Sequence, residues 1–388
     1  MQDLAKSIKQ LPKADLHVHL DGSLRLATII DLAKELKVEL PSYSEDGLKE
    51  LVFKANYQNL PEYLEGFKYT CAVMQDAEAL ERTAYEFAWD CFHDGVIYVE
   101  PRYSPELLKG NKLKAHEVIL AVDRGMKKAQ KEINIIIDKI NQELRFNKVP
   151  ENIVHPAFVY SHIICCMRMW DPQRSLETAT CAVVTKQKHD IPIMAIDLAG
   201  PEDGFPAVDH QDAFIYAHKN FLYKTVHAGE AYGPASIFQA LTYLHADRIG
   251  HGLHLFNTAM VINKTGSEAE EYVKNIVQYL AERRITLEVC LTSNLQTLPL
   301  LANDVKNHSL NKMLAAGLSV AICTDNRLVS NTTVTKELLL AHDSCGFSPK
   351  TLKKIIMYGI KRGFFPGTYL EKKKYIDDAS RYYDYIVS

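Results

Sequence analysis

The feature that most constrains the fold of this 388-residue chain is a regular alternation of short apolar runs with helical patterns. Eight runs read as strands, and residues with helical spacing follow each of them. The predicted strands are the run that ends near His19, then 96–103, 162–167, 192–198, 223–227, 248–250, 285–291 and 319–323. Strands that alternate with helices pair in parallel, and eight such units close into a barrel. The sequence therefore predicts an α/β chain with a (β/α)8 TIM barrel; a doubly wound open sheet is the alternative.

Neither a linker rich in Gly or Ser nor an internal repeat divides the chain, so residues 1–388 are predicted to form a single domain. Additional helices are predicted at 61–74 and 77–93, and more after the last strand. A helix over 115–132 is predicted to end in an irregular insertion, 133–160, before the third strand. There an I-I-I run and two later prolines give conflicting signals.

Composition excludes several classes of function. The net charge of -3 offers no footprint for nucleic acid or an anionic membrane, and no apolar run is long enough to span a bilayer. Because the N-terminus also lacks the apolar region of a signal peptide, the protein is predicted to be cytoplasmic. The eight cysteines form no C-x-x-C pair and are predicted to be free thiols in the core. Their spacing also excludes nucleobase deaminases that bind zinc through a P-C-x-x-C segment.

The stretch A-D-L-H-V-H-L-D-G-S places His17 and His19 two residues apart in a β-like run. In a strand, such residues share a face about 6.8 Å apart, so both imidazoles can lean onto one metal ion. On a helix, the same spacing would turn them about 200° apart. Gly22 and Ser23 then read as a turn and a helix cap, which puts the pair at the carboxyl end of the strand. In α/β folds, ligands bind at that end.

Three other predicted strand ends carry polar groups that a metal hydrolase would use. H-A-G-E supplies His227 and Glu230, G-H-G supplies His251, and T-D-N supplies Asp325 and Asn326. Taken singly, a histidine in such a place is more often a hydrogen-bonded structural residue, and an Asp-Asn pair is usually a turn. All of them follow apolar strands at one rim of the predicted barrel, however. Their joint placement favours a catalytic site.

Three imidazoles and one carboxylate suit Zn²⁺ or a similar transition metal, with a position left open for water. A second metal would need a bridging ligand, and the strand end at 194–200 offers no lysine for that role. One Zn²⁺ per chain is therefore predicted. A phosphoesterase that also uses H-x-H is a weaker alternative, because it would need ligands for further metals and cations near a phosphate.

The motifs H-V-H-L-D-G, Y-V-E-P-R-Y-S-P, D-L-A-G, H-A-G-E, G-H-G and the strand-final T-D resemble those of the adenosine deaminase family. The likeness runs from about Ala14 to Asn326. It implies zinc-dependent hydrolysis of adenosine and 2'-deoxyadenosine to inosine and ammonia, as in purine salvage. The related adenine deaminases usually carry Glu at the place of Asp21, and the AMP deaminases lack the D-G-S continuation, so Asp21 favours a nucleoside substrate.

The resemblance also implies a role for each matching residue. His17, His19, His227 and Asp325 match the zinc ligands, with His19 also facing the substrate and Asp325 also taking part in catalysis. Glu230 matches the proton donor to purine N1, and His251 the residue that holds and deprotonates the catalytic water. Gly200 matches a backbone contact to N3, and Asp21 the partner of the ribose 5'-hydroxyl. Asn326 stands where many members have a second Asp that contacts N7.

Two alternatives of function remain at this stage. One is a deaminase for adenine or another 6-aminopurine within the same superfamily. The other is a catalytically silent relative that binds nucleosides and acts in signalling. The partners expected in every case are a small nucleoside or base, with water as co-substrate for the enzymes, and neither nucleic acid nor a membrane.

Overall fold

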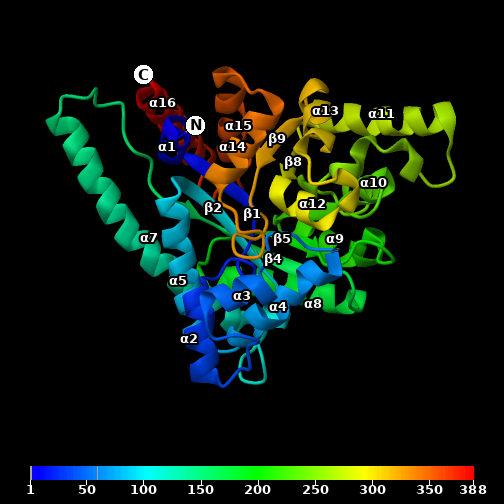
Figure 1. The fold of residues 1–388 in the computed structure, drawn as a ribbon, viewed down its shortest axis with the longest axis horizontal. Helices are drawn as coiled ribbons and strands as arrows, with labels where there is room; N and C mark the ends of the chain where they lie inside the picture. Colours follow the sequence, from blue (N-terminus) through cyan, green and yellow to red (C-terminus); the bar gives the residue numbers. More distant parts are fainter. Residues whose placement is uncertain (1, 59) are drawn as a thin grey trace.

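Eight parallel strands form a nearly closed barrel in the computed structural model, which describes residues 2–58 and 60–388 (Figure 1). Their order around the barrel is β1-β2-β4-β5-β6-β7-β8-β9, and the two-residue β3 (Val159–Tyr160) pairs with β2. The eight are β1 (Lys13–His19), β2 (Val96–Tyr103), β4 (His162–Met167), β5 (Ile193–Ala199), β6 (Tyr223–Ala228), β7 (Arg248–His251), β8 (Thr286–Val289) and β9 (Ser319–Ile322).

The barrel closes between its first and last strands just beyond the end of β9. Val18 and Asp325 form a parallel bridge, in which the Asp325 N–H donates to the His17 carbonyl (2.8 Å) and the His19 N–H donates to the Asp325 carbonyl (2.7 Å). This closure confirms the predicted (β/α)8 barrel and excludes the open sheet. It also brings the first histidine pair against the T-D-N segment, about 300 residues away in the chain.

Helices surround the strands, and the predicted additional helices are present. The terminal helices α1 and α16 lie close together, beside the labelled chain ends in Figure 1. The helices are α1 (Gln2–Gln10), α2 (Leu26–Leu36), α3 (Glu45–Leu51), α4 (Leu60–Val73), α5 (Ala77–His93), α6 (Pro105–Leu108), α7 (Ala115–Phe146), α8 (Pro172–His189), α9 (Gln211–Lys219), α10 (Pro234–Thr242), α11 (Gly266–Arg283), α12 (Leu291–Thr297), α13 (Leu310–Ala315), α14 (Val334–Cys345), α15 (Pro349–Arg362) and α16 (Tyr369–Val387).

The interior of the barrel holds charged side chains as well as apolar ones. The Arg102 guanidinium, fully buried, pairs with Asp197 (3.0 Å) and with Glu288 (2.9 Å). Arg248 pairs with the other oxygen of Glu288 (2.6 Å) and with Glu100. Buried charges are costly unless they are paired and hydrogen-bonded, so each of these groups needs the partner that the network supplies.

The prediction of an irregular segment at 133–160 is wrong for its first half. Helix α7 continues to Phe146, because Ile133 and Ile137, one turn apart, are both buried on its inner face. The I-I-I run looked strand-like, yet its first two isoleucines face solvent. The chain then returns along the helix, and the side chain of Asn134 pairs with both backbone groups of Phe158 (2.8 and 3.2 Å).

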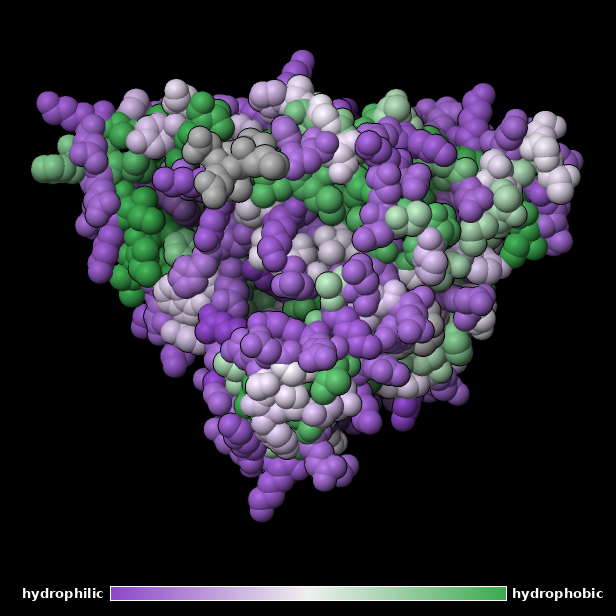
Figure 2. All heavy atoms as spheres, in the orientation of Figure 1, coloured by the Kyte–Doolittle hydropathy of each residue, from purple (hydrophilic) through white to green (hydrophobic). Residues whose placement is uncertain are grey.

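The cysteines agree with the prediction of free thiols, although three of the eight are only partly buried. All eight cysteines are free, and five of them are fully buried. Within the described part of the chain, none of the helices combines the length and the apolar character needed to cross a bilayer. The face of the molecule in Figure 2 is mainly hydrophilic and is hollowed near its centre.

Candidate metal centre and active site

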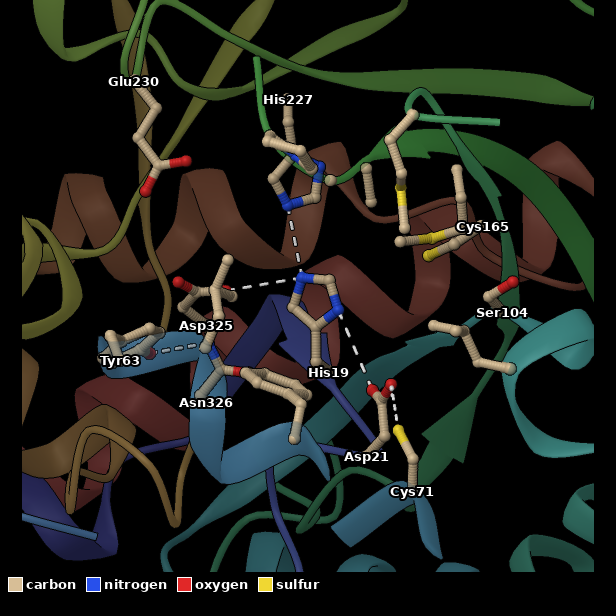
Figure 3. A pocket seen from close by; sticks show the side chains of 18 of the residues that line it. His19, Asp21, Tyr63, Cys71, Ser104, Cys165, His227, Glu230, Asp325 and Asn326 are labelled. Atoms are coloured by element: carbon tan, nitrogen blue, oxygen red, sulfur yellow. Dashed lines mark hydrogen bonds and ion pairs between the residues drawn. The ribbon is translucent and has the colours of Figure 1, made fainter. Parts of the chain in front are cut away.

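Four potential metal ligands converge at the carboxyl-end rim of the barrel. His17 and His19 come from β1, His227 from β6, and Asp325 follows β9; one donor atom from each lies within 4.8 Å of the others. Nε2 of His17 and Nε2 of His19 are each 3.4 Å from Asp325 Oδ1, and Nε2 of His19 is 3.2 Å from Nε2 of His227. Figure 3 shows His19, His227 and Asp325 pointing toward one another.

The backbone around this cluster is strained. Asp325 and His251 both adopt left-handed conformations, with φ of 61° and 63°, which are rare for residues other than glycine. Such strain gathers at functional sites. At Gly250, a Cβ atom would lie only 2.9 Å from Cε1 of His17, so the absence of a side chain lets the histidine ring approach β7.

Buried carboxylates fix the orientation of two of the histidines. Nδ1 of His17 donates to Glu288 (2.7 Å), and Nδ1 of His227 donates to Asp197 (3.0 Å). Arg102 pairs with both carboxylates and ties the two histidines to one guanidinium. With Nδ1 engaged, each ring presents Nε2 to the cluster, which is the arrangement typical of metal-ligating histidines.

The protonation states of His17, His19 and Asp325 also suit metal ligands. Burial lowers the pKa of His17 to about 4 and lowers that of His19 well below its ordinary value, so both imidazoles are neutral at pH 7. Although burial acts in the opposite sense, the pKa of Asp325 lies well below that of a free carboxyl, and the Ser293 hydroxyl donates to its Oδ2 (2.6 Å), which favours the ionised form. Nε2 of His17 is buried and makes no hydrogen bond to any described residue. A buried nitrogen left in this way is accounted for by a metal ion.

The cluster forms one wall of a cavity of about 370 Å³, within the size range of small-molecule sites. Helix α4 and the loops after several strands enclose it. Each remaining sequence-predicted site residue lies in its lining: Asp21, Gly200, Glu230, His251 and Asn326. The rest of the lining is largely apolar and includes Leu64, Phe67, Leu107, Met167 and Met169.

Glu230 and His251 face each other beside the cluster. Oε2 of Glu230 is 3.7 Å from Nε2 of His251. Burial raises the pKa of the Glu230 carboxyl, which keeps its proton to a higher pH than a free glutamate does. The arrangement thus sets a potential proton donor within reach of the metal cluster (Figure 3).

Two other polar side chains of the cavity, Asp21 and Asn326, make hydrogen bonds with neighbouring residues. Asp21 is 4 % exposed and accepts a hydrogen bond from the Cys71 thiol (3.8 Å), and burial raises the pKa of its carboxyl to about 6. Nδ2 of Asn326 donates to the Tyr63 hydroxyl (2.7 Å). The amide lies across Gly22, where a Cβ atom would come within 1.9 Å of Asn326 Oδ1. The glycine of the D-G-S motif is therefore required for close approach.

Sequence reasoning missed the residues that support the site. Glu202 is the clearest case, because its carboxylate accepts four backbone N–H groups, those of residues 229–232, at 2.6–2.9 Å. It had no visible signal beyond following D-L-A-G. Glu288, Asp197 and Arg102 did have one, since each is a charged residue inside a largely apolar strand. Such a charge needs a buried partner.

A (β/α)8 barrel with imidazoles and a carboxylate gathered at the carboxyl ends of its strands defines the class of metal-dependent barrel hydrolases. Within that class, the chain belongs to the adenosine deaminase family, because the family model described as "Adenosine deaminase" matches residues 12–380.

Individual relatives agree with this membership. The chain is 36 % identical over 358 residues to a probable adenosine deaminase of Dictyostelium discoideum, with 92 % of this chain but only 41 % of that protein covered. It is 32 % identical over 375 residues to an adenosine deaminase of Mycobacteroides abscessus, with 96 % and 95 % covered. Among solved structures, an adenine deaminase from Arthrobacter aurescens shares the fold, with a TM-score of 0.75 at 20 % identity over 97 % of this chain and all of that one.

Proposed function

We propose that this protein is a zinc-dependent aminohydrolase that converts adenosine, and 2'-deoxyadenosine, to inosine and ammonia. The observation that carries the proposal is the gathering of His17, His19, His227, Asp325 and Glu230 around one cavity that also contains Asp21. The first five residues suit hydrolysis at a purine amidine carbon, and the buried carboxylate of Asp21 suits a sugar hydroxyl. Family members at 32–36 % identity that are named adenosine deaminases support the substrate.

The residues present fit a zinc ion. His17 and His19, both neutral at pH 7, and the ionised Asp325 are donors that Zn²⁺ prefers, and three or four protein ligands leave room for water. When bound, zinc lowers the pKa of water from about 15.7 to about 7 and so supplies a nucleophile at neutral pH. The described residues offer this one group of four ligands, and the proposal assigns one zinc ion per chain to it.

The chain's own residues then have the following roles in the proposal. Glu230, whose pKa is raised by burial, gives its proton to purine N1 while water attacks C6. His251 contacts the attacking water, and the Gly200 backbone contacts N3. Asp21 accepts the ribose 5'-hydroxyl. One hydrogen of the Asn326 amide is bonded to Tyr63, which leaves the other for N7.

The test is a comparison of adenosine, adenine and AMP as substrates of the metal-replete protein, followed by ultraviolet absorbance and ammonia release. Fastest turnover of adenosine is expected. Fastest turnover of adenine would assign the protein to the adenine deaminases, which the shared fold of the Arthrobacter aurescens enzyme makes the second candidate. Binding of adenosine without turnover would show a catalytically silent relative.

A further inference from the structure

A chain of hydrogen bonds beneath the rim ends on His251. Three fully or almost fully buried side chains, His251, Asn294 and His308, are exposed by 1 %, 0 % and 3 %. Nδ1 of His251 is 3.2 Å from Asn294 Nδ2, and Asn294 Oδ1 is 3.2 Å from His308 Nε2. The backbone N–H of Leu310 points at His308 Nδ1 (3.0 Å). These groups come from β7, from α12 and from the segment before α13.

The direction of this chain follows from its first donor. A backbone N–H can only donate, so Nδ1 of His308 must accept and carries no proton. Burial also lowers the pKa of His308 to about 3, which keeps the ring neutral with its one proton on Nε2. That Nε2–H must donate to Asn294, so the oxygen of the amide faces His308. Reversing the amide would set two donors against each other at 3.2 Å.

Because its oxygen accepts from His308, the side-chain NH₂ group of Asn294 faces His251. Nδ1 of His251 therefore accepts, and the neutral ring carries its proton on Nε2. That nitrogen faces the reaction site, 3.7 Å from Glu230 Oε2. The Nε2 atom thus presents an N–H group there, with no lone pair to take a proton.

We propose that Asn294 and His308 are positioning residues that lock His251 in the Nε2–H tautomer, so that His251 donates a hydrogen bond to the attacking oxygen. This deepens the proposed function and rests on it for the identity of the reaction. It replaces the proton-accepting role of His251 that the family resemblance implies. The interaction is a hydrogen bond and transfers no proton to His251; zinc, when bound, would let the attacking water lose its proton to solvent near neutral pH. Preorganised donors of this kind stabilise negative charge as it develops in a transition state.

The tautomer can be read directly from ¹⁵N NMR of histidine-labelled protein, zinc-loaded and zinc-free, because protonated and unprotonated ring nitrogens have distinct chemical shifts. The His251 signals are assigned by their loss in His251→Gln. We expect His251 and His308 both to carry the proton on Nε2 in the wild type. A proton on Nδ1 of His251 would overturn the proposal, whether or not the protein deaminates adenosine.

The decisive variant is Asn294→Asp, because a carboxylate only accepts and moves the His251 proton to Nδ1. We expect that shift in the spectrum together with a fall in kcat of about 10²-fold at similar KM, the usual effect of losing one such donor. Asn307→Asp, the same change beside His308 but directed at the Leu301 carbonyl, is the control and should leave both readouts unchanged. A proton on Nδ1 with near-normal kcat would refute the donor role.

If Asn294→Asp does not fold, the spectra of Asn294→Ala and of the wild type still test whether Asn294 sets the tautomer of His251. The alanine variant removes the donor without supplying an acceptor, so we expect a mixture of His251 tautomers. An unchanged, pure Nε2–H tautomer in that variant would show that Asn294 does not set it. Failure of the proposed function would appear separately, as a wild-type protein with the expected tautomer and no turnover of adenosine.

Discussion

Glu230 differs from a structural carboxylate in needing a proton at neutral pH. Its burial beside the metal cluster raises its pKa and so favours the proton that this role needs. Because the folded-state pKa is above the ordinary value, the proton is present at low pH and is lost as the pH rises through that pKa. The kcat of the enzyme should therefore fall on the alkaline side as Glu230 ionises.

Replacement of Glu230 by Gln should lower kcat by about 10² to 10⁴-fold, because an amide cannot deliver a proton to N1. Zinc content, measured by elemental analysis, should stay at the wild-type value. The exposed Glu270 provides the control, and Glu270→Gln should leave kcat unchanged. A Glu230→Gln enzyme with near-normal kcat would remove this residue from the proposed mechanism.

At Asp21, the prediction concerns the sugar. If the carboxylate accepts the 5'-hydroxyl, kcat/KM for adenosine should exceed that for 5'-deoxyadenosine by about 1.5 to 3 kcal/mol, the range for a hydrogen bond to a charged group. Burial raises the pKa of Asp21 to about 6, so the preference should shrink as the pH falls through that value and the carboxylate becomes neutral.

The same two substrates measured with Asp21→Ala provide the control for this contact. The variant should lose the preference for adenosine, because the methyl group accepts no hydrogen bond. Equal kcat/KM for the two substrates in the wild type at pH 7 would show that Asp21 does not touch the 5'-hydroxyl.

At the level of elements, the loop between β6 and α10 is held in place by one carboxylate. Glu202 accepts the N–H groups of residues 229–232, and so fixes the backbone that carries Glu230. A carboxylate offers acceptor oxygens only, whereas an amide would turn an NH₂ group toward some of these donors. A buried donor left unsatisfied costs about 1–3 kcal/mol.

Replacement of Glu202 by Gln should therefore lower kcat at least about tenfold, with zinc content unchanged. Because Glu202 acts through Glu230, adding the change to Glu230→Gln should cost nothing further in kcat. The exposed Asp203 provides the control, and Asp203→Asn should have no effect. Independent, multiplying losses in the double variant would show general damage to the fold in place of positioning.

Helix α7 is an element whose conformation the local sequence pattern predicts wrongly. The I-I-I run in its second half has the composition of a strand, but burial of Ile133 and Ile137 on one helical face decides the conformation. The return segment is held by Asn134 across 24 residues. Neither contact is visible in a local window of sequence.

For the whole molecule, the candidate metal ligands come from β1, β6 and the segment after β9, so one bound ion would join the beginning, the middle and the end of the chain. Zinc should stabilise the folded state by about 4 kcal/mol at a free concentration 1,000 times Kd, because the unfolded chain does not hold the ligands together. Thermal unfolding at increasing zinc should show a rising Tm, and chelation should reverse the rise.

His17→Ala should abolish both the zinc-dependent rise in Tm and the bound zinc, together with activity. His189→Ala is the matched control, since this histidine is exposed at the end of α8 and should leave all three unchanged. A zinc-independent Tm in the wild type, or full turnover in a rigorously metal-free sample, would contradict the assigned cluster.

By itself, the sequence determined the barrel and the rim on which polar groups collect. Period-two and helical patterns are local, and eight alternating units have few ways to pair, so the placement of His17, His227 and Asp325 on one edge followed from chain order. Only the tertiary structure decided which groups orient them. Arg102 meets Glu288 and Asp197 across 186 and 95 residues, and the direction of the amide at Asn294 depends on a backbone N–H sixteen residues away. Such contacts are set by three-dimensional packing and leave no periodic trace in the chain.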